Sequence, residues 1–196
     1  MSTTAGTRPQ LFDIAALARR RDRAVRLGFA DGADFLWRIA ADRIAERLED
    51  TARAFPEAVL VGTGAGAVAE ALPVKAGSER FAQHDPSPAM AAMAEAARPG
   101  TAAALDLAAP LPFAEAGADL ALSILQMHWL DDPVGHLVQL RRALRPDGLM
   151  IACLFGARTV AELRAALGFA EAEVTGGLTP RVAPMGEIRD LGALLQ

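Results

Sequence analysis

The sequence predicts an α/β fold in which helices cover both faces of one parallel β-sheet. Short apolar runs of strand length alternate with segments whose apolar residues recur at helical spacing, a pattern typical of strands joined by crossover helices. A glycine-rich turn, Gly62 to Gly66, stands directly between the first apolar run and the next helix. These observations together predict five parallel strands.

Composition bounds the class of protein. The 196 residues suit one α/β domain with additional helices, and the 52% hydrophobic content can form a core. A net charge of −4 argues against a nucleic-acid binder. The single cysteine, Cys153, excludes an intrachain disulfide and favours a reducing compartment. Neither a secretory signal nor a membrane span is evident, so we expect a cytoplasmic protein.

The first fifty residues are expected to form a disordered tail and two helices. Helical spacing of apolar residues places these helices at about 11–27 and 34–50, after a tail of residues 1–10. The first helix carries five arginines between Arg19 and Arg26. They form either a solvated face or a contact surface for an acidic partner. We expect residues 1–50 to pack on a domain of residues 51–196, giving one compact domain overall.

The core elements then alternate along the chain. Strands are expected at residues 58–62, 81–84, 102–105, 119–125 and 149–155, and helices at 68–72, 87–97 and 133–144. The sequence RPDG, Arg145 to Gly148, is a turn signature between the last helix and the last strand.

The glycine turn is the first candidate for a ligand site. Gly62, Gly64 and Gly66 let the backbone turn tightly and let a ligand approach it, while the following helix presents free N–H groups. Such a turn can also be purely structural, but its place between a strand and a helix favours ligand binding.

Asp85 is the second candidate, at the end of the second strand and 19 residues beyond Gly66. An acid at that spacing lies beside the first turn and can accept both ribose hydroxyls of a nucleoside. The alternative is a helix N-cap, because Asp85-Pro86 precedes a helix, although Ser87 also suits that position. We favour the ribose role.

Further candidates follow the third and fourth strands. Asp106 could accept a hydrogen bond from an adenine amino group, with Leu107 packing on the ring, or it is a plain loop acid. Gln126 and His128 follow the fourth strand, where this fold class places ligand-facing residues. His128 is either a general base, a group that orients the substrate, or a structural histidine. The histidines and Cys153 show no metal-ligand spacing, so no metal is predicted.

The glycine turn alone leaves a rival interpretation. Gly62, Gly64 and Ala67 also satisfy the dinucleotide fingerprint GxGxxG/A, so a nicotinamide-dependent oxidoreductase is an alternative.

Downstream motifs resemble one family. Residues 111–156 carry LPF and DL before the fourth strand, HW after it and RPDG before the fifth, and so resemble the class I S-adenosylmethionine-dependent methyltransferases. The motifs ELR, GG-x-T-P and DLG-x-LL between residues 162 and 195 resemble the methyltransferase-like assembly factors of mitochondrial respiratory complex I and their bacterial relatives. The core is also similar to the malonyl-carrier-protein methyltransferases of biotin synthesis.

This resemblance implies a Rossmann-like methyltransferase sheet that binds S-adenosyl-L-methionine. It implies a methyl acceptor (a small molecule, an acyl carrier or a protein side chain) near His128. It equally permits a non-catalytic or hydroxylase-like assembly factor for a respiratory complex. The implied cofactor-binding residues are Gly62, Thr63, Gly64, Gly66, Asp85, Pro86, Asp106, Leu107 and Gln126.

The sequence departs from the family in two ways. Leu60 stands where the family usually has an Asp or Glu that helps to hold the methionine end of the cofactor. The family also continues past DLGALL into two further strands. Without them the fifth strand is an exposed edge that invites a protein partner or a homodimer.

Overall fold

The computed structural model describes residues 10–29, 32–179 and 181–195. The chain forms two compact units, Met1–Cys153 and Leu154–Gln196. Nearly all of the expected tail lies outside the described residues, and the expected boundary at residue 50 stays a prediction.

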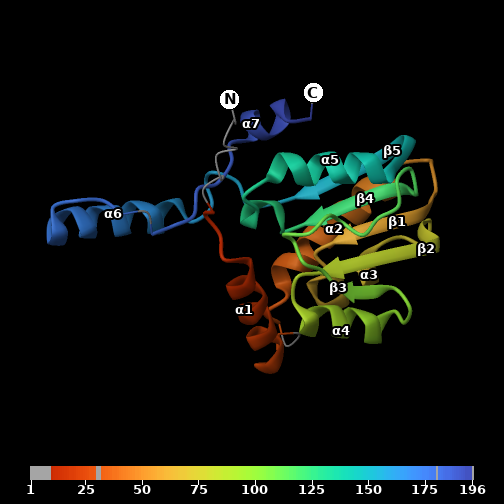
Figure 1. Cartoon of the computed structure of the whole chain (residues 1–196), viewed down its shortest axis with the longest axis horizontal. Helices are drawn as coiled ribbons and strands as arrows, with labels where there is room; N and C mark the ends of the chain where they lie inside the picture. The colour runs from red at the N-terminus through yellow and green to blue at the C-terminus, as the bar shows by residue number, and fades with distance from the viewer. Residues whose placement is uncertain (1–9, 30–31, 180, 196) are drawn as a thin grey trace, which may run out of the picture. The chain divides into compact units, whose positions relative to one another are not determined.

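The first unit contains a five-stranded parallel sheet, which confirms the predicted fold class (Figure 1). Its strands lie in the order β3-β2-β1-β4-β5, so the order reverses at β1, which has β2 on one side and β4 on the other. Ligands bind α/β sheets at the carboxyl ends of the strands beside such a reversal. The strands are β1 (Phe55–Val61), β2 (Ala76–Asp85), β3 (Ala102–Ala104), β4 (Ala118–Ile124) and β5 (Leu144–Cys153).

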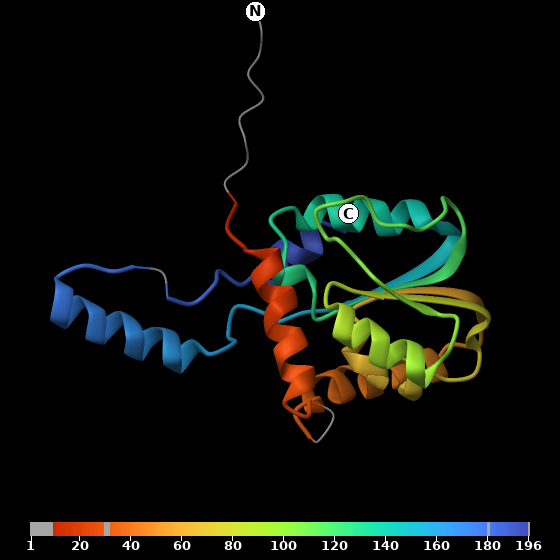
Figure 2. The same ribbon diagram turned by 60° about the horizontal axis from the view of Figure 1, so that its bottom comes forward.

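Helices cover both faces of this sheet. Helices α2 (Phe35–Glu49), α3 (Ala67–Ala71) and α4 (Pro88–Ala97) lie on one face, and α5 (Pro133–Ala143) lies on the other (Figure 2). Side-chain caps start two of them: Ser87 Oγ accepts from Met90 N at 3.1 Å, and Asp132 Oδ1 accepts from Gly135 N at 3.0 Å. Ser87, and not Asp85, is therefore the N-cap of α4.

Helix α1 (Ile14–Arg26) lies at the end of the sheet toward which the strands point (Figure 1). The Asp13 side chain caps it by accepting from Ala16 N at 2.8 Å. Asp22 joins it to the start of α4, because its Oδ1 accepts from Ser87 Oγ at 2.6 Å and from Ala89 N at 3.1 Å. The helix is thereby held across the carboxyl ends of the strands.

The core is built around β4, in which every residue is buried. Parallel strands covered on both faces read as continuous apolar runs, and β4 interrupts its run only with Asp119 and Ser123. On one face the apolar cluster comprises Val59, Val61, Leu105, Ala118, Ala121, Leu140 and Leu144.

Strands β2 and β5 differ most from their predicted bounds, since each begins five residues earlier than predicted. The RPDG turn lies inside β5 and not before it: Leu144 pairs with Ala118 and Leu149 with Leu120, so residues 145–148 face one residue of β4. The turn chemistry is real, since Asp147 has a φ of 65°, but it makes a bulge in the strand. Strand β2 begins at Ala76, earlier than predicted, because its polar residues 78–80 hide it from an apolar pattern.

The second unit contains α6 (Ala161–Thr175) and α7 (Ile188–Ala193). Within it, Glu171 accepts from Arg181 Nη2 at 2.7 Å and from Thr179 N at 2.9 Å. The hydrogen bond from Arg181 is the main reason that the pKa of Glu171 falls to about 2.

Asp119 anchors an ion-pair network at the amino ends of the strands. It is 7% exposed, and its carboxylate accepts from Glu57 N at 3.0 Å and from Arg145 Nη1 at 3.1 Å. We predict that Asp119→Ala lowers the free energy of unfolding by about 1–3 kcal/mol, because a backbone donor then lacks its partner. Urea denaturation measures the change.

The matched control is Glu46→Ala in α2, which removes an exposed carboxylate that pairs with Arg43 at 3.2 Å. Surface pairs of this kind contribute about 0–1 kcal/mol. Equal losses for the two variants would contradict this account of the network.

Candidate functional site

The glycine turn lies where the strand order reverses. Gly62 follows β1 with a φ of 97°, and its N–H donates to His84 O of β2 at 2.8 Å. A methyl group added at Gly62 would lie 2.1 Å from Ile124 O and 2.7 Å from Gln126 Nε2. The turn is thus wedged between the ends of β2 and β4, and a side chain does not fit there.

Asp85 lies beside this turn, as its spacing predicts. The residue is fully buried, and its Oδ2 accepts from Thr63 N at 3.1 Å and from Thr63 Oγ1 at 3.4 Å. Its Oδ1 accepts from Ser87 N at 2.9 Å. The carboxylate therefore joins the glycine turn to the start of α4, and its role toward a ribose stays a prediction.

A cation that the sequence analysis did not place in the site also reaches Asp85. Arg21 of α1 is 6% exposed; its Nη1 lies 3.2 Å from Asp85 Oδ1, and its Nη2 donates to Leu125 O at 3.2 Å. The arginine run is a solvated face only in part, since Arg21 is buried. The signal was present: Arg21 follows Leu17 by four residues, and these two are the buried residues of α1.

Trp37 of α2 lies against the same turn. A methyl group added at Gly64 would lie 2.3 Å from Trp37 Cδ1, so the indole packs directly on the backbone. The guanidinium carbon of Arg21 is 5.6 Å from the centre of the Trp37 ring, and the Phe29 ring is 5.5 Å away. Two N-terminal helices therefore supply side chains to the space over the turn.

Gln126, immediately after β4, carries an unused amide. The residue is fully buried, and neither Nε2 nor Oε1 has a hydrogen-bond partner among the residues that the structure describes. A buried amide without partners costs on the order of 1–3 kcal/mol, and native proteins rarely retain one without a reason. This amide lies against Gly62 of the turn, and its contact with a ligand stays a prediction.

The remaining predicted cofactor-binding residues, Asp106, Leu107 and Pro86, lie outside the glycine turn. Asp106 is exposed, and its Oδ1 accepts from Ala108 N at 2.9 Å, which is the local geometry of a loop acid. Leu107 packs against the apolar core cluster. Pro86 is buried between Asp85 and α4. Contacts of any of these with an adenine stay predictions.

His128 lies in the short turn Met127–Trp129 after β4. Burial, and secondarily the charge of Arg21, lowers its pKa to about 4. Its ring is tilted at 47° against that of Trp129, with centroids 5.4 Å apart. The imidazole is therefore uncharged at neutral pH and can form hydrogen bonds with an uncharged group.

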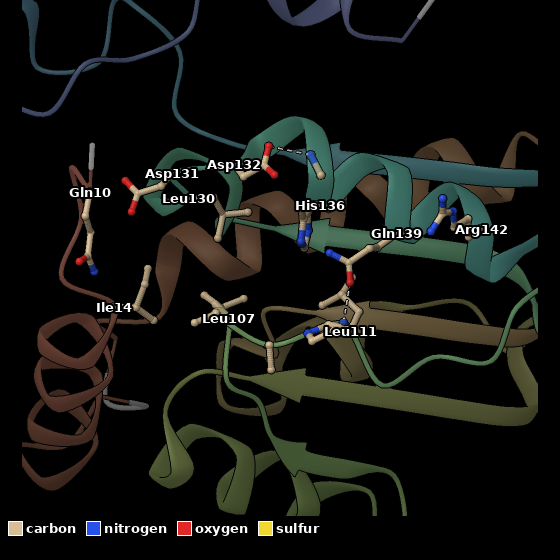
Figure 3. A pocket seen from close by; sticks show the side chains of 14 residues that line it. Gln10, Ile14, Leu107, Leu111, Leu130, Asp131, Asp132, His136, Gln139 and Arg142 are labelled. Atoms are coloured by element: carbon tan, nitrogen blue, oxygen red, sulfur yellow. Dashed lines mark hydrogen bonds between the residues drawn. The ribbon is translucent and has the colours of Figure 1, made fainter. Parts of the chain in front are cut away.

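A cavity of about 510 Å³ opens between α5 and the segment after β3 (Figure 3). Gln139 Oε1 accepts from Leu111 N at 2.7 Å and ties the two walls together. His136 also lines the cavity, 3.0 Å from Ser123 Oγ, and burial lowers its pKa to about 4. Small-molecule sites commonly have this size. The side chains shown in Figure 3 include Ile14, Leu107, Leu111, Leu130, His136 and Gln139.

Other chemistry is not assembled in the part of the chain that the structure describes. Burial raises the pKa of the Cys153 thiol, which is half-buried at the end of β5. The described residues contain no group of three or more His, Cys, Asp or Glu side chains that could hold a metal ion. None of the described helices is both long and apolar enough to cross a bilayer.

Comparisons with known proteins agree with this fold. Residues 59–152 match the family model described as "Methyltransferase domain". The chain is 36% identical to "Arginine-hydroxylase NDUFAF5, mitochondrial" of Danio rerio over 94% of its length and 57% of that protein. It is 32% identical to "Malonyl-[acyl-carrier protein] O-methyltransferase" of Methylovorus sp. over 80% of its length and 55% of that protein. The chain thus spans a little more than half the length of these relatives.

Among solved structures, the fold resembles an S-adenosylmethionine-dependent methyltransferase of Thermotoga maritima, described as a possible histamine N-methyltransferase. The TM-score is 0.63 at 18% identity, covering 93% of this chain and 79% of that one. At this identity the likeness shows the shared fold.

We predict that Gly62→Ala lowers the free energy of unfolding by more than the strain of a positive φ alone would cost. The added methyl group meets a backbone carbonyl 2.1 Å away, which cannot move without disturbing β4. Gly100→Ala is the matched control, because Gly100 also has a positive φ (76°) but nothing lies within 4 Å of the added group. That control should cost about 1 kcal/mol. Equal melting temperatures for the two variants would argue against the wedged turn.

We also predict an acid-dependent loss of stability. The folded pKa of His128 and of His136 is about 4, below the ordinary value of 6.5, so the unfolded state binds more protons between these values. Stability is therefore full above pH 6.5 and falls as the pH drops toward 4. His136→Gln and His128→Gln should each flatten this dependence, by on the order of 1–3 kcal/mol across the window. Denaturant titrations at pH 7 and pH 5 measure it, and an unchanged slope would rule out the assigned histidine.

Proposed function

We propose that the chain binds S-adenosyl-L-methionine at the glycine turn and transfers the methyl group to an acceptor. The match of residues 59–152 to a methyltransferase domain and the fold shared with a solved S-adenosylmethionine-dependent methyltransferase support this proposal. One arrangement carries this proposal: the Asp85 carboxylate lies 3.1 Å from Thr63 N of the turn, and the unused amide of Gln126 lies against Gly62. An acceptor for hydroxyls, a backbone cradle and a free amide suit an adenosyl group.

The residues present fit this cofactor by the chemistry of their groups. Asp85 would receive the ribose hydroxyls, and the backbone of residues 62–66 would contact the methionine portion. Leu107 and Asp106 would face the adenine, beside Pro86. When bound, the cofactor supplies an electrophilic methyl group on a sulfonium, so the protein's main task is to align the two reactants.

Leu60 changes how the methionine end is held. It is fully buried in β1 and pairs with Gln83 of β2 and Leu122 of β4. An apolar side chain there offers no anion to the cofactor's ammonium group. We expect the turn's carbonyl oxygens to take this role, at some cost in affinity.

His128 and the cavity are two separate candidates for the place of the acceptor, since the cavity lining includes neither His128 nor the glycine turn. The neutral imidazole of His128 can orient a hydroxyl, amine or carboxyl group by a hydrogen bond, and its low pKa makes orientation a better role than strong base catalysis. The cavity between α5 and residues 107–111 combines apolar walls with His136 and Gln139. It suits a partly apolar acceptor: a small molecule, an acyl chain on a carrier, or a protein side chain.

A second candidate is a hydroxylase-like or non-catalytic assembly factor for a respiratory complex. The 36% identity to a protein named an arginine-hydroxylase, over 94% of this chain, favours it, and so does Leu60. The arginines on the exposed face of α1 and the β5 edge are then candidate protein contacts, and a homodimer through that edge is a further option. Methyl transfer to a defined acceptor by the purified chain would refute a non-catalytic role, whereas co-purification with a respiratory-complex subunit would support the assembly role.

A nicotinamide-dependent oxidoreductase is the third candidate. It shares the strand order at this reversal point, so the sheet does not separate it from a methyltransferase. The family match disfavours it. Fluorescence transfer from Trp37 or Trp129 to bound reduced nicotinamide would reveal such a site.

A cytoplasmic location stays our proposal, and the arginine-hydroxylase relative is named as mitochondrial.

Gln126 provides the sharpest test of the cofactor site. We predict that Gln126→Met raises the free energy of unfolding, because it removes a buried amide without partners, and weakens binding of S-adenosylhomocysteine about tenfold. The control, Gln139→Met, removes an amide that is already hydrogen-bonded to Leu111 N. It should lower stability and leave the affinity unchanged.

Calorimetric titration measures the affinity, and urea denaturation measures the stability. Unchanged affinity for Gln126→Met would contradict the assigned site. A folded wild-type chain that gives no heat up to millimolar ligand would contradict cofactor binding altogether.

A further inference from the structure

We propose that Arg21 is an internal competitor for the cofactor: its guanidinium occupies the ribose position on Asp85 and must leave before a nucleoside binds. The inference rests on the proposed function, because it concerns the same pocket. It assigns to α1 control over access to the site, and not only a covering role.

The Asp85 carboxylate is already saturated with hydrogen bonds. A carboxylate offers about four lone-pair positions, and four hydrogen bonds already converge on this one. The donors are Arg21 Nη1 at 3.2 Å, Ser87 N at 2.9 Å, Thr63 N at 3.1 Å and Thr63 Oγ1 at 3.4 Å. Ribose hydroxyls can therefore bind Asp85 only by displacing a donor.

Of the four donors to Asp85, Arg21 is the one that can leave. The N–H groups of Thr63 and Ser87 belong to the turn after β1 and to the start of α4, so both are held by the backbone around Asp85. Arg21 reaches the site from α1 through a long side chain whose dihedral angles can change while the helix stays in place. The helix has its own anchor to α4 through Asp22, which does not involve Asp85. Arg21 is thus the displaceable partner.

Trp37 completes the obstruction. Its indole packs on Gly64, where a ligand would approach the backbone, and it also contacts the Arg21 guanidinium. The indole Nε1 is buried and has no hydrogen-bond partner within the described part of the chain, so the closed arrangement leaves one donor unused there. Movement of Arg21 removes one neighbour of this ring, and the environment of Trp37 should change when a nucleoside enters.

Charge adds to the competition. The methyl-donor form of the cofactor carries a positive sulfonium, whereas its demethylated product does not. In the closed arrangement Arg21 neutralises the Asp85 carboxylate 3.2 Å away, so the pair has no net attraction for a cation; without Arg21, the unpaired carboxylate attracts a cation strongly, because the surroundings are poorly polarisable. Removal of the Arg21 charge should therefore favour the sulfonium form more than the neutral thioether.

The test is Arg21→Met, which keeps an unbranched apolar chain and removes the charge. We expect this variant to bind S-adenosylhomocysteine at least tenfold more tightly than the wild type, and to gain still more for S-adenosylmethionine, both measured by calorimetric titration. Arg23→Met, on the exposed face of the same helix, is the control and should bind both ligands as the wild type does. Weaker or unchanged binding by Arg21→Met would overturn the proposal, because Arg21 would then hold the ligand or have no effect on it.

A measurement on the native residue covers the case in which Arg21→Met does not fold. In a Trp129→Phe chain, Trp37 is the only tryptophan. Saturating S-adenosylhomocysteine should shift its emission and speed hydrogen exchange of the Arg21 guanidinium protons by NMR. Binding without either change would show that Arg21 stays on Asp85 and would refute the competition. If neither chain binds either ligand, the proposed function itself fails; if all bind alike, only the competition fails.

Discussion

The buried carboxylate of Asp85 is the point on which the architecture of the site depends. It accepts from the turn after β1, from the start of α4 and from Arg21 of α1, so three segments far apart in the sequence meet on one side chain. An ionised group in so dry a position is tolerable only with a counter-charge and full hydrogen bonding, and both are present. Removal of either member of the pair leaves the other buried without its counter-charge, while Asp22 still anchors α1 to α4.

Several groups around this ion pair lower the stability of the fold and are of a kind that suits ligand binding. The Gln126 amide is buried without partners, Gly62 and Gly64 leave no room for a side chain, and His128 is held neutral at a pKa of about 4. Destabilising features of this kind concentrate at functional sites, where a bound ligand can interact with the groups concerned. The network of Asp119 at the other end of the sheet shows the opposite pattern, with its hydrogen bonds made within the protein.

The sequence predicted the elements whose signals are local. Apolar runs located β1 and β4, helical spacing located α1 and α2, and Ser87 was recognised as a possible cap for α4. The start of β2 was missed because its exposed residues are polar, and the RPDG turn was placed outside β5 because a bulge and a loop share the same turn chemistry. Arg21 was grouped with its exposed neighbours, although its spacing from Leu17 gives its orientation. The cavity beside α5 could not be foreseen, since its walls come from segments that only the fold brings together.

The most direct test of the central claim is a crystal structure of the chain with S-adenosylhomocysteine. We predict ribose hydroxyls within hydrogen-bond distance of the Asp85 carboxylate, the Gln126 amide facing the ligand, and the Arg21 guanidinium displaced from its present 3.2 Å contact. A ligand bound elsewhere, with Arg21 still paired to Asp85, would contradict it.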